Sequence, residues 1–217
     1  MAAWSFSRWA CWALCGLQYK LRYIDKLPEP QSPAMARGND IHIGIAKYLE
    51  GKADAPPAEA ATTFGAQLAE LRALPNKSVE QKWAFNRQWR GTGYFAKDVY
   101  LRSVLDVGLV YDDNTADIID HKTGKKYGSN TEQVELFALS AMCMWPQVTR
   151  VTARLWYIDA DDEEIIEFSA ADREKLKAKW DANASKMLSD TIFAPRPNDK
   201  CRFCNWSRSK GGPCKFG

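Results

Sequence analysis

Alternating apolar and polar positions dominate the middle of the chain, between residues 104 and 124. The pattern predicts two β-strands there, VLDVGLVY and TADIIDHKT, joined by a polar turn at residues 112–114. Acidic side chains stand inside both apolar runs, Asp106 in the first and Asp120 in the second. A carboxylate inside a strand is costly to desolvate unless a cation or a metal pairs with it. This hairpin is therefore the first candidate for a functional site.

Helical periodicity precedes the hairpin, and strands and helices follow it. Helices are predicted at 5–24, from Ser32-Pro33 to Gly51, at 62–74, at 130–145 and from Ser169 to Leu188. Strands are predicted at 79–85, around 89–95, at 101–111, at 115–123 and as a hairpin within 148–168. This order predicts an α/β fold with a central mixed β-sheet flanked by helices. We expect a single domain, residues 1–217, that comprises an N-terminal helical part (1–78), a core (79–190) and a cysteine-rich tail (191–217).

The composition indicates the general class of protein but does not identify a binding partner. A chain of 217 residues, 46% hydrophobic and 26% charged, is typical of a globular protein. No apolar run approaches the roughly 20 residues that cross a bilayer, and the N-terminus lacks a signal-peptide layout, so we expect a cytoplasmic protein with no membrane partner. The net charge of +3 is small. Lysine and arginine are nevertheless clustered locally, which permits nucleic-acid binding without requiring it.

Further polar residues surround the predicted hairpin. Lys122 lies two residues after Asp120, so both side chains share one face of the strand. An isolated pair of this kind is most often a structural ion pair, and a lone histidine beside an apolar helical stripe, such as His42, is usually a core residue. Gln133 lies on the helix that follows the second strand, at the same end of the sheet. Two carboxylates, a lysine and a histidine together favour a metal-binding site.

Six cysteines occur, at positions 11, 15, 143, 201, 204 and 214. The C-x-x-C spacing of Cys201 and Cys204 points to a metal or a redox pair rather than to a disulfide scaffold. With Cys214 they place three thiolates on a tail that has little other means of folding. A fourth ligand would come from elsewhere, and spacing alone does not separate zinc from an iron–sulfur cluster. Cys143, on an apolar helix face, is expected in the core, and Trp206 either covers the metal or stacks on single-stranded nucleic acid.

The order of these motifs resembles the PD-(D/E)XK nuclease superfamily, in its RecB-like branch. The motifs that carry the resemblance are G-x-x-x-H (Gly38, His42), Asp106, D-x-K (Asp120, Lys122), Q-x-x-x-[YF] (Gln133, Phe137) and the N-terminal set Ser5, Ser7, Trp12, Cys15 and Tyr19. Together with the C-terminal cysteines they are similar to the AddB nuclease domain, CRISPR-adaptation nucleases and phage-type exonucleases. Each motif alone is weak, but five in the same order, spanning residues 5–214, are strong.

The resemblance implies a restriction-endonuclease-like core and an Mg²⁺- or Mn²⁺-dependent deoxyribonuclease. Such an enzyme hydrolyses phosphodiester bonds, as an exonuclease of DNA processing or recombination. Asp106, Asp120 and His42 would hold the metal. The backbone carbonyl of His121 would join them, while its side chain would point to the opposite face.

The remaining motif residues are given supporting roles by the same resemblance. Lys122 would orient or deprotonate the attacking water and help to neutralise the phosphate, and Gln133 would position the active-site strand or the nucleic acid. Phe137 stands where tyrosine is common, which removes one hydroxyl group. Glu80 corresponds to an acidic residue often found on the first strand, in a supporting position.

The cysteines are implied to hold a structural [4Fe-4S] cluster, with zinc as the other possible occupant. Cys15, Cys201, Cys204 and Cys214 would be its ligands, with Cys11 competing for the position of Cys15. The nine residues between Cys204 and Cys214 exceed the family's usual spacing.

The implied substrate is DNA, single-stranded or as a duplex with ends. A helicase, recombinase or integrase, where one takes part, would be a separate chain, and a phage-encoded protein would act in the host cytoplasm. The alternative is a catalytically silent DNA-end-binding or scaffold module with the same fold. The complete set of His42, Asp106, Asp120 and Lys122 argues against that alternative, because degenerate copies usually lose at least one of these residues.

Overall fold

The computed structural model describes residues 3–126 and 129–217. The chain forms two compact units, one made of residues 32–177 and the other of residues 4–31 together with 178–217. The predicted division at residues 78 and 190 stays a prediction. Among the described residues, no helix combines the length and the apolar character needed to cross a bilayer.

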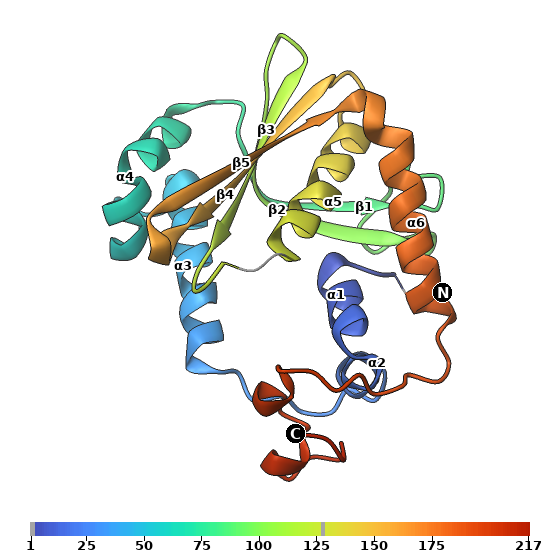
Figure 1. The fold of residues 1–217 in the computed structure, drawn as a ribbon. Helices are drawn as coiled ribbons and strands as arrows, with labels where there is room; N and C mark the ends of the chain where they lie inside the picture. The colour runs from blue at the N-terminus through green and yellow to red at the C-terminus, as the bar shows by residue number, and fades with distance from the viewer. Residues whose placement is uncertain (1–2, 127–128) are drawn as a thin grey trace. The chain divides into compact units, whose positions relative to one another are not determined.

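A five-stranded sheet forms the centre of the larger unit (Figure 1). Its strands, in spatial order, are β1 (Ser78–Phe85), β2 (Leu101–Val110), β3 (Thr115–Lys122), β4 (Arg150–Tyr157) and β5 (Asp162–Ser169). Strands β3 and β4 are parallel and the other neighbours are antiparallel. Helix α5 (Ser129–Met144) makes the long crossover that a parallel pair requires. The predicted mixed sheet flanked by helices is confirmed.

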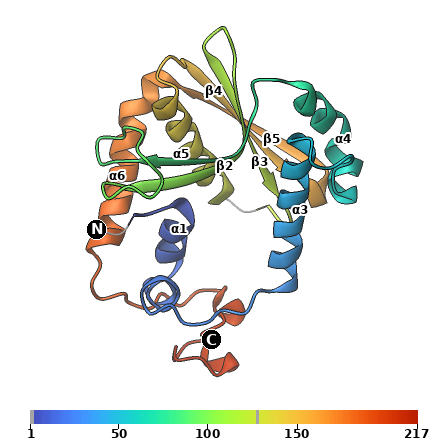
Figure 2. The same cartoon turned by 180° about the vertical axis from the view of Figure 1, so that it is seen from behind.

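Helices α3 (Pro33–Leu49) and α4 (Ala58–Ala73) pack against one face of the sheet, as the view from behind also shows (Figure 2). Their apolar side chains form a buried cluster with those of β2, β3 and β4. It includes Ile41, Ile45, Phe64, Leu68, Val107, Ile119 and Trp156. The rings of Phe64 and Trp156 stack with their centroids 4.6 Å apart. This packing fixes α3 beside the acidic hairpin.

The ends of α3 are those that the sequence predicts. The Ser32 hydroxyl accepts a hydrogen bond from the backbone N–H of Met35 at 3.2 Å, and Pro33 occupies the first helical turn. Gly51 follows the helix with φ of 75°, a conformation that glycine adopts without strain. Helix α4 begins at Ala58, four residues earlier than expected.

The strand predicted around residues 89–95 is wrong. Residues 86–100 form an irregular excursion between β1 and β2, with one isolated bridge between Phe85 and Gly91. The Asn86 carboxamide oxygen accepts from the backbone N–H groups of Gln88 and Arg90 at 3.0 and 3.1 Å, and Trp89 has φ of 57°. This local turn ends the strand despite the aromatic residues that follow.

The smaller unit contains a broken N-terminal helix, where the sequence predicts one continuous helix at 5–24. It consists of α1 (Phe6–Leu14), α2 (Gly16–Tyr19) and a π-helical turn (Lys20–Ile24), with an extended residue, Cys15, between the first two. Ser5 caps α1. Gly16 is required because an added Cβ would lie 3.0 Å from the Ala194 carbonyl oxygen.

Helix α6 (Arg173–Ser189) contributes Trp180 to an aromatic cluster in this unit. Trp180 is fully buried, with its ring centroid 6.0 Å from that of Trp4 and 4.9 Å from that of Trp9. Ser169 caps a single 3₁₀ turn that precedes α6, rather than α6 itself.

We expect Leu68→Ala to lower the free energy of unfolding by about 2–5 kcal/mol, because Leu68 is fully buried between α3, α4 and the sheet. Urea denaturation measures the change. Met35→Ala, at a side chain that is 53% exposed, is the matched control and should change the unfolding free energy little. Equal effects of the two substitutions would contradict the described packing of α4.

Candidate metal centre

The site begins where β2 and β3 separate. The two strands pair from Val110 opposite Ala116 to Val107 opposite Ile119, and Asp106 is the first residue of β2 beyond this pairing. On the other side of β2, Glu80 of β1 has φ of 49°, an uncommon conformation for a residue with a side chain. Both neighbours of β2 are thus irregular at Asp106.

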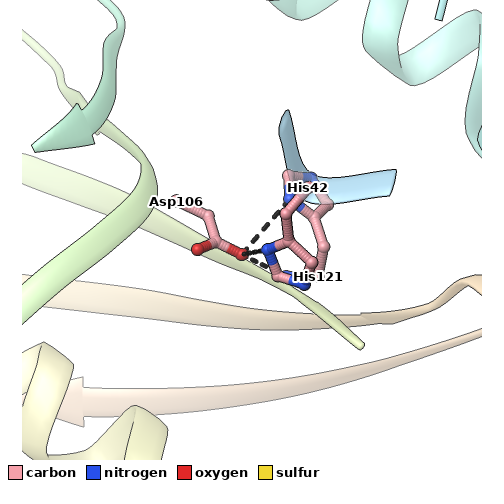
Figure 3. Close-up of side chains that lie close together, drawn as sticks. All are labelled: His42, Asp106 and His121. Atoms are coloured by element: carbon pink, nitrogen blue, oxygen red, sulfur yellow. Dashed lines mark hydrogen bonds and ion pairs between the residues drawn. The ribbon is translucent and has the colours of Figure 1, made fainter. Parts of the chain in front are cut away.

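Three side chains converge at this fork (Figure 3). The Asp106 Oδ2 atom lies 3.2 Å from His42 Nδ1 and 3.3 Å from His121 Nδ1, and it accepts a hydrogen bond from the His121 backbone N–H at 2.8 Å. One ligand atom from each of the three residues lies within 4.8 Å of the others. No other group of three such residues meets this distance in the described part of the chain.

The electrostatics of the cluster favour a charged carboxylate at Asp106. Burial raises the pKa of Asp106, but the hydrogen bonds from His121 and His42 outweigh it and hold that pKa well below its ordinary value. For His42, burial lowers the pKa, while the hydrogen bond and the charge of Asp106 raise it by more. The two histidines therefore stabilise the ionised form of the Asp106 carboxylate.

Asp120 belongs to a second, adjoining cluster. Its side chain is almost fully buried, and Lys122 Nζ lies 2.5 Å from Asp120 Oδ2 and 2.7 Å from Gln133 Oε1. Burial raises the pKa of Asp120, and the charge of Asp106 adds to this rise, while Lys122 and His42 act in the opposite direction. One lysine does not fully compensate two neighbouring carboxylates, so an additional cation would be stabilised here.

The position of the His121 side chain differs from expectation. Strict alternation along β3 predicts that its ring points away from Asp106, yet the ring is 2% exposed and contacts Asp106. The separation of β2 from β3 explains the difference, because it lets the Asp106 carboxylate reach the face that carries His121. The ligand role of the His121 backbone carbonyl remains a prediction.

No local sequence pattern identifies the residues that hold α3 against the end of β3. Arg37 on α3 donates two hydrogen bonds to Asp159, at 2.9 and 2.8 Å, and Asp159 also accepts from the Gly124 backbone N–H at 2.6 Å. Gly38 permits the approach, because an added Cβ would lie 2.9 Å from the Thr123 hydroxyl. Arg37 and Asp159 are 122 positions apart in the chain, so no local pattern links them.

Glu80 and Phe137, also singled out from the sequence, lie in different surroundings. Glu80 lies near the site: burial raises its pKa, the charge of Asp106 raises it further, and the histidines of the cluster lower it. Phe137 is buried on α5, which accords with a packing position.

The cysteine cluster is not supported by the structure. All six cysteines are free, and no three of their sulfur atoms converge to metal-binding distance in the described chain. The tail is held against the first helices by hydrogen bonds. Arg196 Nη1 donates to the Ala13 carbonyl at 2.9 Å, and Trp12 Nε1 donates to Asp190 at 2.7 Å.

Individual cysteines nevertheless differ in their surroundings. Burial raises the pKa of Cys11 and of Cys143 to about 11, which disfavours the thiolate form at either position. Trp206 is only 4% exposed, so its ring is not available to stack on a base.

The donor set of the fork suits a divalent cation. Carboxylate oxygens are the ligands that Mg²⁺ and Mn²⁺ prefer, and an imidazole nitrogen adds preference for Mn²⁺. The structure brings His42 and Asp106 into contact, and it places Asp120 with Lys122 and Gln133 beside them. The residues predicted for the metal and the phosphate thus form two adjoining clusters around β2 and β3.

Three comparisons show which known proteins the chain resembles. The sequence model of the PD-(D/E)XK nuclease superfamily matches residues 3–209. A search of curated proteins gives no match. Among solved structures, a protein described as SSO0001 is 14% identical, with a TM-score of 0.52. The alignment covers 99% of this chain and 87% of that protein. A protein from Eubacterium rectale described as "Putative exonuclease" is 12% identical, with a TM-score of 0.53. The alignment covers 94% of this chain and 87% of that protein. At these identities the likeness is one of fold.

We expect Mn²⁺ to stabilise the protein after it has been stripped with EDTA. At 100 times its Kd the ion should raise the free energy of unfolding by about 2.7 kcal/mol, measured by thermal denaturation. Asp106→Asn should remove most of this gain, because an amide lacks the charge that binds the ion.

Asp112→Asn, on the exposed turn of the same hairpin, is the matched control and should keep the full gain. A gain that is the same in both variants would place the ion elsewhere.

Proposed function

Because the chain belongs to the PD-(D/E)XK nuclease superfamily, we propose that it is an Mg²⁺- or Mn²⁺-dependent deoxyribonuclease that removes nucleotides from DNA ends. The observation that carries the proposal is the contact of Lys122 with both Asp120 and Gln133, directly beside the His42–Asp106 pair. This places a cation, two carboxylates and an imidazole where a phosphate and a hydrated ion can meet. DNA processing or recombination is the setting that suits such an activity.

Each residue has a role that follows from its contacts. Asp106, Asp120 and His42 hold the metal, with the carbonyl of His121 as a further ligand. When bound, the metal lowers the pKa of a water molecule and neutralises charge on the phosphate. The His121 N–H and ring hold the Asp106 carboxylate in place. Gln133 keeps Lys122 oriented, since its oxygen accepts from the ammonium group.

Lys122 is the group that faces the reacting phosphate. Its side chain is 18% exposed and its ammonium group is shared between Asp120 and Gln133, so the group is fixed before the substrate arrives. A preorganised cation in a partly dry site stabilises developing negative charge more strongly than a mobile one in water. The same group orients the attacking water.

A catalytically silent DNA-end-binding module is the competing function. It would need the same fold and cationic surface but not the metal centre. Support for catalysis comes from the fork itself, because a scaffold gains nothing from two buried carboxylates that share only one lysine and two histidines. Activity on ends finds support in the likeness of fold to the protein described as "Putative exonuclease".

Digestion of end-labelled DNA tests the activity. We expect wild-type protein with Mn²⁺ or Mg²⁺ to degrade linear DNA and to spare a covalently closed circle, and EDTA to abolish cleavage. Asp120→Asn and Lys122→Met should each lower the rate about 100-fold or more, because each removes charge from the reacting centre.

Lys125→Met is the matched control, because Lys125 is an exposed lysine three positions beyond Lys122. It should cleave at the wild-type rate. Thermal denaturation of every variant separates loss of chemistry from loss of fold. Cleavage by Asp120→Asn at the wild-type rate would refute the metal centre, and binding of DNA ends without cleavage by wild type would favour the silent module.

We also propose that Cys15, Cys201, Cys204 and Cys214 hold a [4Fe-4S] cluster. Three of these sulfurs accept backbone hydrogen bonds: Cys15 from Arg196 N–H at 3.4 Å, Cys201 from Asn198 N–H at 3.3 Å, and Cys204 from Trp206 N–H. Such bonds stabilise thiolate charge and are found around iron–sulfur clusters. A cluster is larger than a single zinc ion, so its ligands stand further apart.

Anaerobic purification followed by iron, sulfide and zinc analysis tests the cluster. We expect a coloured protein with visible absorbance, and we expect Cys15→Ser to lose the colour. Cys11→Ser is the control and should retain it, because Cys11 is buried away as a thiol. A colourless protein with stoichiometric zinc, or one with no metal, would overturn the proposal.

A further inference from the structure

The irregular excursion between β1 and β2 carries an unusual concentration of positive charge. Together with the first two residues of β2 it forms residues 86–102, which contain four cations, Arg87, Arg90, Lys97 and Arg102, and one carboxylate, Asp98. Their formal sum, four minus one, is +3 and equals the net charge of the whole 217-residue chain. Within the described part of the chain, neither Arg90 nor Lys97 forms an ion pair. The excursion is therefore a local cationic surface on a nearly neutral protein.

Internal contacts give this excursion a defined shape. Trp89 is buried, and its ring packs edge-on against Tyr100 with centroids 6.4 Å apart. The Thr92 hydroxyl donates to Asp98 at 2.9 Å, and the Thr92 N–H donates to the Ala84 carbonyl at 2.9 Å. An open pocket of about 290 Å³ lies in the excursion, lined in part by Arg87, Lys97 and Tyr100.

An aromatic side chain stands out from this surface. Phe95 is 85% exposed, more than any other large apolar residue of the described chain. The Arg102 guanidinium lies over the rings of Tyr94 and Phe95, 5.3 and 5.7 Å from their centroids, and Arg102 Nε donates to the Tyr94 carbonyl at 2.9 Å. The ring of Phe95 is thus presented to solvent on a supported backbone.

The excursion connects to the metal centre along one face of β2. Residues 102, 104 and 106 alternate with buried neighbours, so Arg102 and Asp106 lie on the same face, about 13 Å apart along the strand. Lys82 of β1 stands opposite Val104 and shares this face. Two cations therefore lie between the exposed aromatic residue and the carboxylates.

We propose that residues 86–102 bind single-stranded DNA and guide it along β2 to the metal centre. Phe95 stacks on a base, Arg90 and Lys97 contact phosphates, and Arg102 and Lys82 continue the phosphate track toward Asp106. The proposal rests on the proposed DNA nuclease function and adds to it a strand-specific substrate path. Exposed aromatic rings among cations are how sequence-tolerant single-strand binding is achieved, because every base offers a face for stacking.

The observations favour a nucleic acid over a protein partner. A partner that covers Phe95 would also have to desolvate Arg102, whose guanidinium lies over its ring, which is unfavourable without a matching carboxylate. A phosphate backbone supplies one negative charge per nucleotide and releases counterions on binding. A paired duplex keeps its bases stacked internally and offers Phe95 no free face, so the surface selects unpaired strands.

Fluorescence anisotropy in EDTA, where no cleavage occurs, measures the role of Phe95. A labelled 20-nucleotide oligothymidine should bind Phe95→Ala about 5- to 150-fold more weakly than wild type, which corresponds to one stacked base. Phe95→Tyr should bind like wild type, because the ring is kept. Ile192→Ala, at a side chain 84% exposed, is the matched control and should not change the affinity. Unchanged affinity of Phe95→Ala would overturn the proposal and leave the excursion to a protein partner.

The salt dependence of the same binding tests the phosphate contacts. Each lost phosphate contact should reduce the slope of log affinity against log salt by about 0.7 for a single strand. Lys97→Gln should therefore bind more weakly with a shallower slope, whereas Phe95→Ala should bind more weakly with an unchanged slope. Identical slopes for wild type and Lys97→Gln would contradict the assigned phosphate contact.

Failure of the proposed strand path can be distinguished from failure of the proposed nuclease activity. Cleavage of end-labelled single strands by wild type but not by Lys122→Met, together with unchanged binding by Phe95→Ala, would refute only the path along β2. Absence of metal-dependent cleavage by wild type, with Phe95-dependent binding retained, would refute the nuclease and leave single-strand binding as the function of this surface.

Discussion

The need to keep two buried carboxylates charged is the constraint on which the rest of this structure depends. Asp106 is relieved by hydrogen bonds from two histidines and a backbone N–H, whereas Asp120 has one lysine to offset both its burial and the charge of Asp106. The protein's own groups do not remove the whole free-energy cost of burying these two charged carboxylates. A site of this kind is poised to bind a cation, since the free energy lost on desolvating the carboxylates is recovered when the ion enters.

The site forms where the sheet departs from regular strand geometry, around Asp106 of β2. Strands β2 and β3 stop pairing after Val107 and Ile119, and Glu80 adopts a left-handed conformation on the other side of β2. Around this irregular centre the frame is regular and well packed, with α3 and α4 on the buried cluster that contains Phe64 and Trp156. Local strain persists where surrounding packing determines the backbone, and it is common at functional sites.

Local features of the sequence were sufficient to predict much of this arrangement, because they act over a few residues. The Ser32-Pro33 helix start, the β2–β3 hairpin and the shared face of Asp120 and Lys122 all follow from periodicity and capping. Features that depend on tertiary contact were missed. The ring of His121 reaches Asp106 only because the strands diverge, Arg37 meets Asp159 across 122 positions, and the turn at Asn86 overrides the strand propensity of residues 89–95.

The distribution of charge follows from the same constraint. An acidic metal centre repels a phosphate backbone until a cation is bound, so attraction of the substrate has to come from elsewhere on the surface. In the proposed substrate path, residues 86–102 offer that attraction at a distance, and the place of Arg102 on the Asp106 face of β2 gives the attraction a direction. Under this proposal the residues that attract DNA are separate from those that hold the metal, in a chain whose net charge is only +3. A small net charge is therefore compatible with a nucleic-acid substrate when the cations are gathered beside the site rather than spread over the protein.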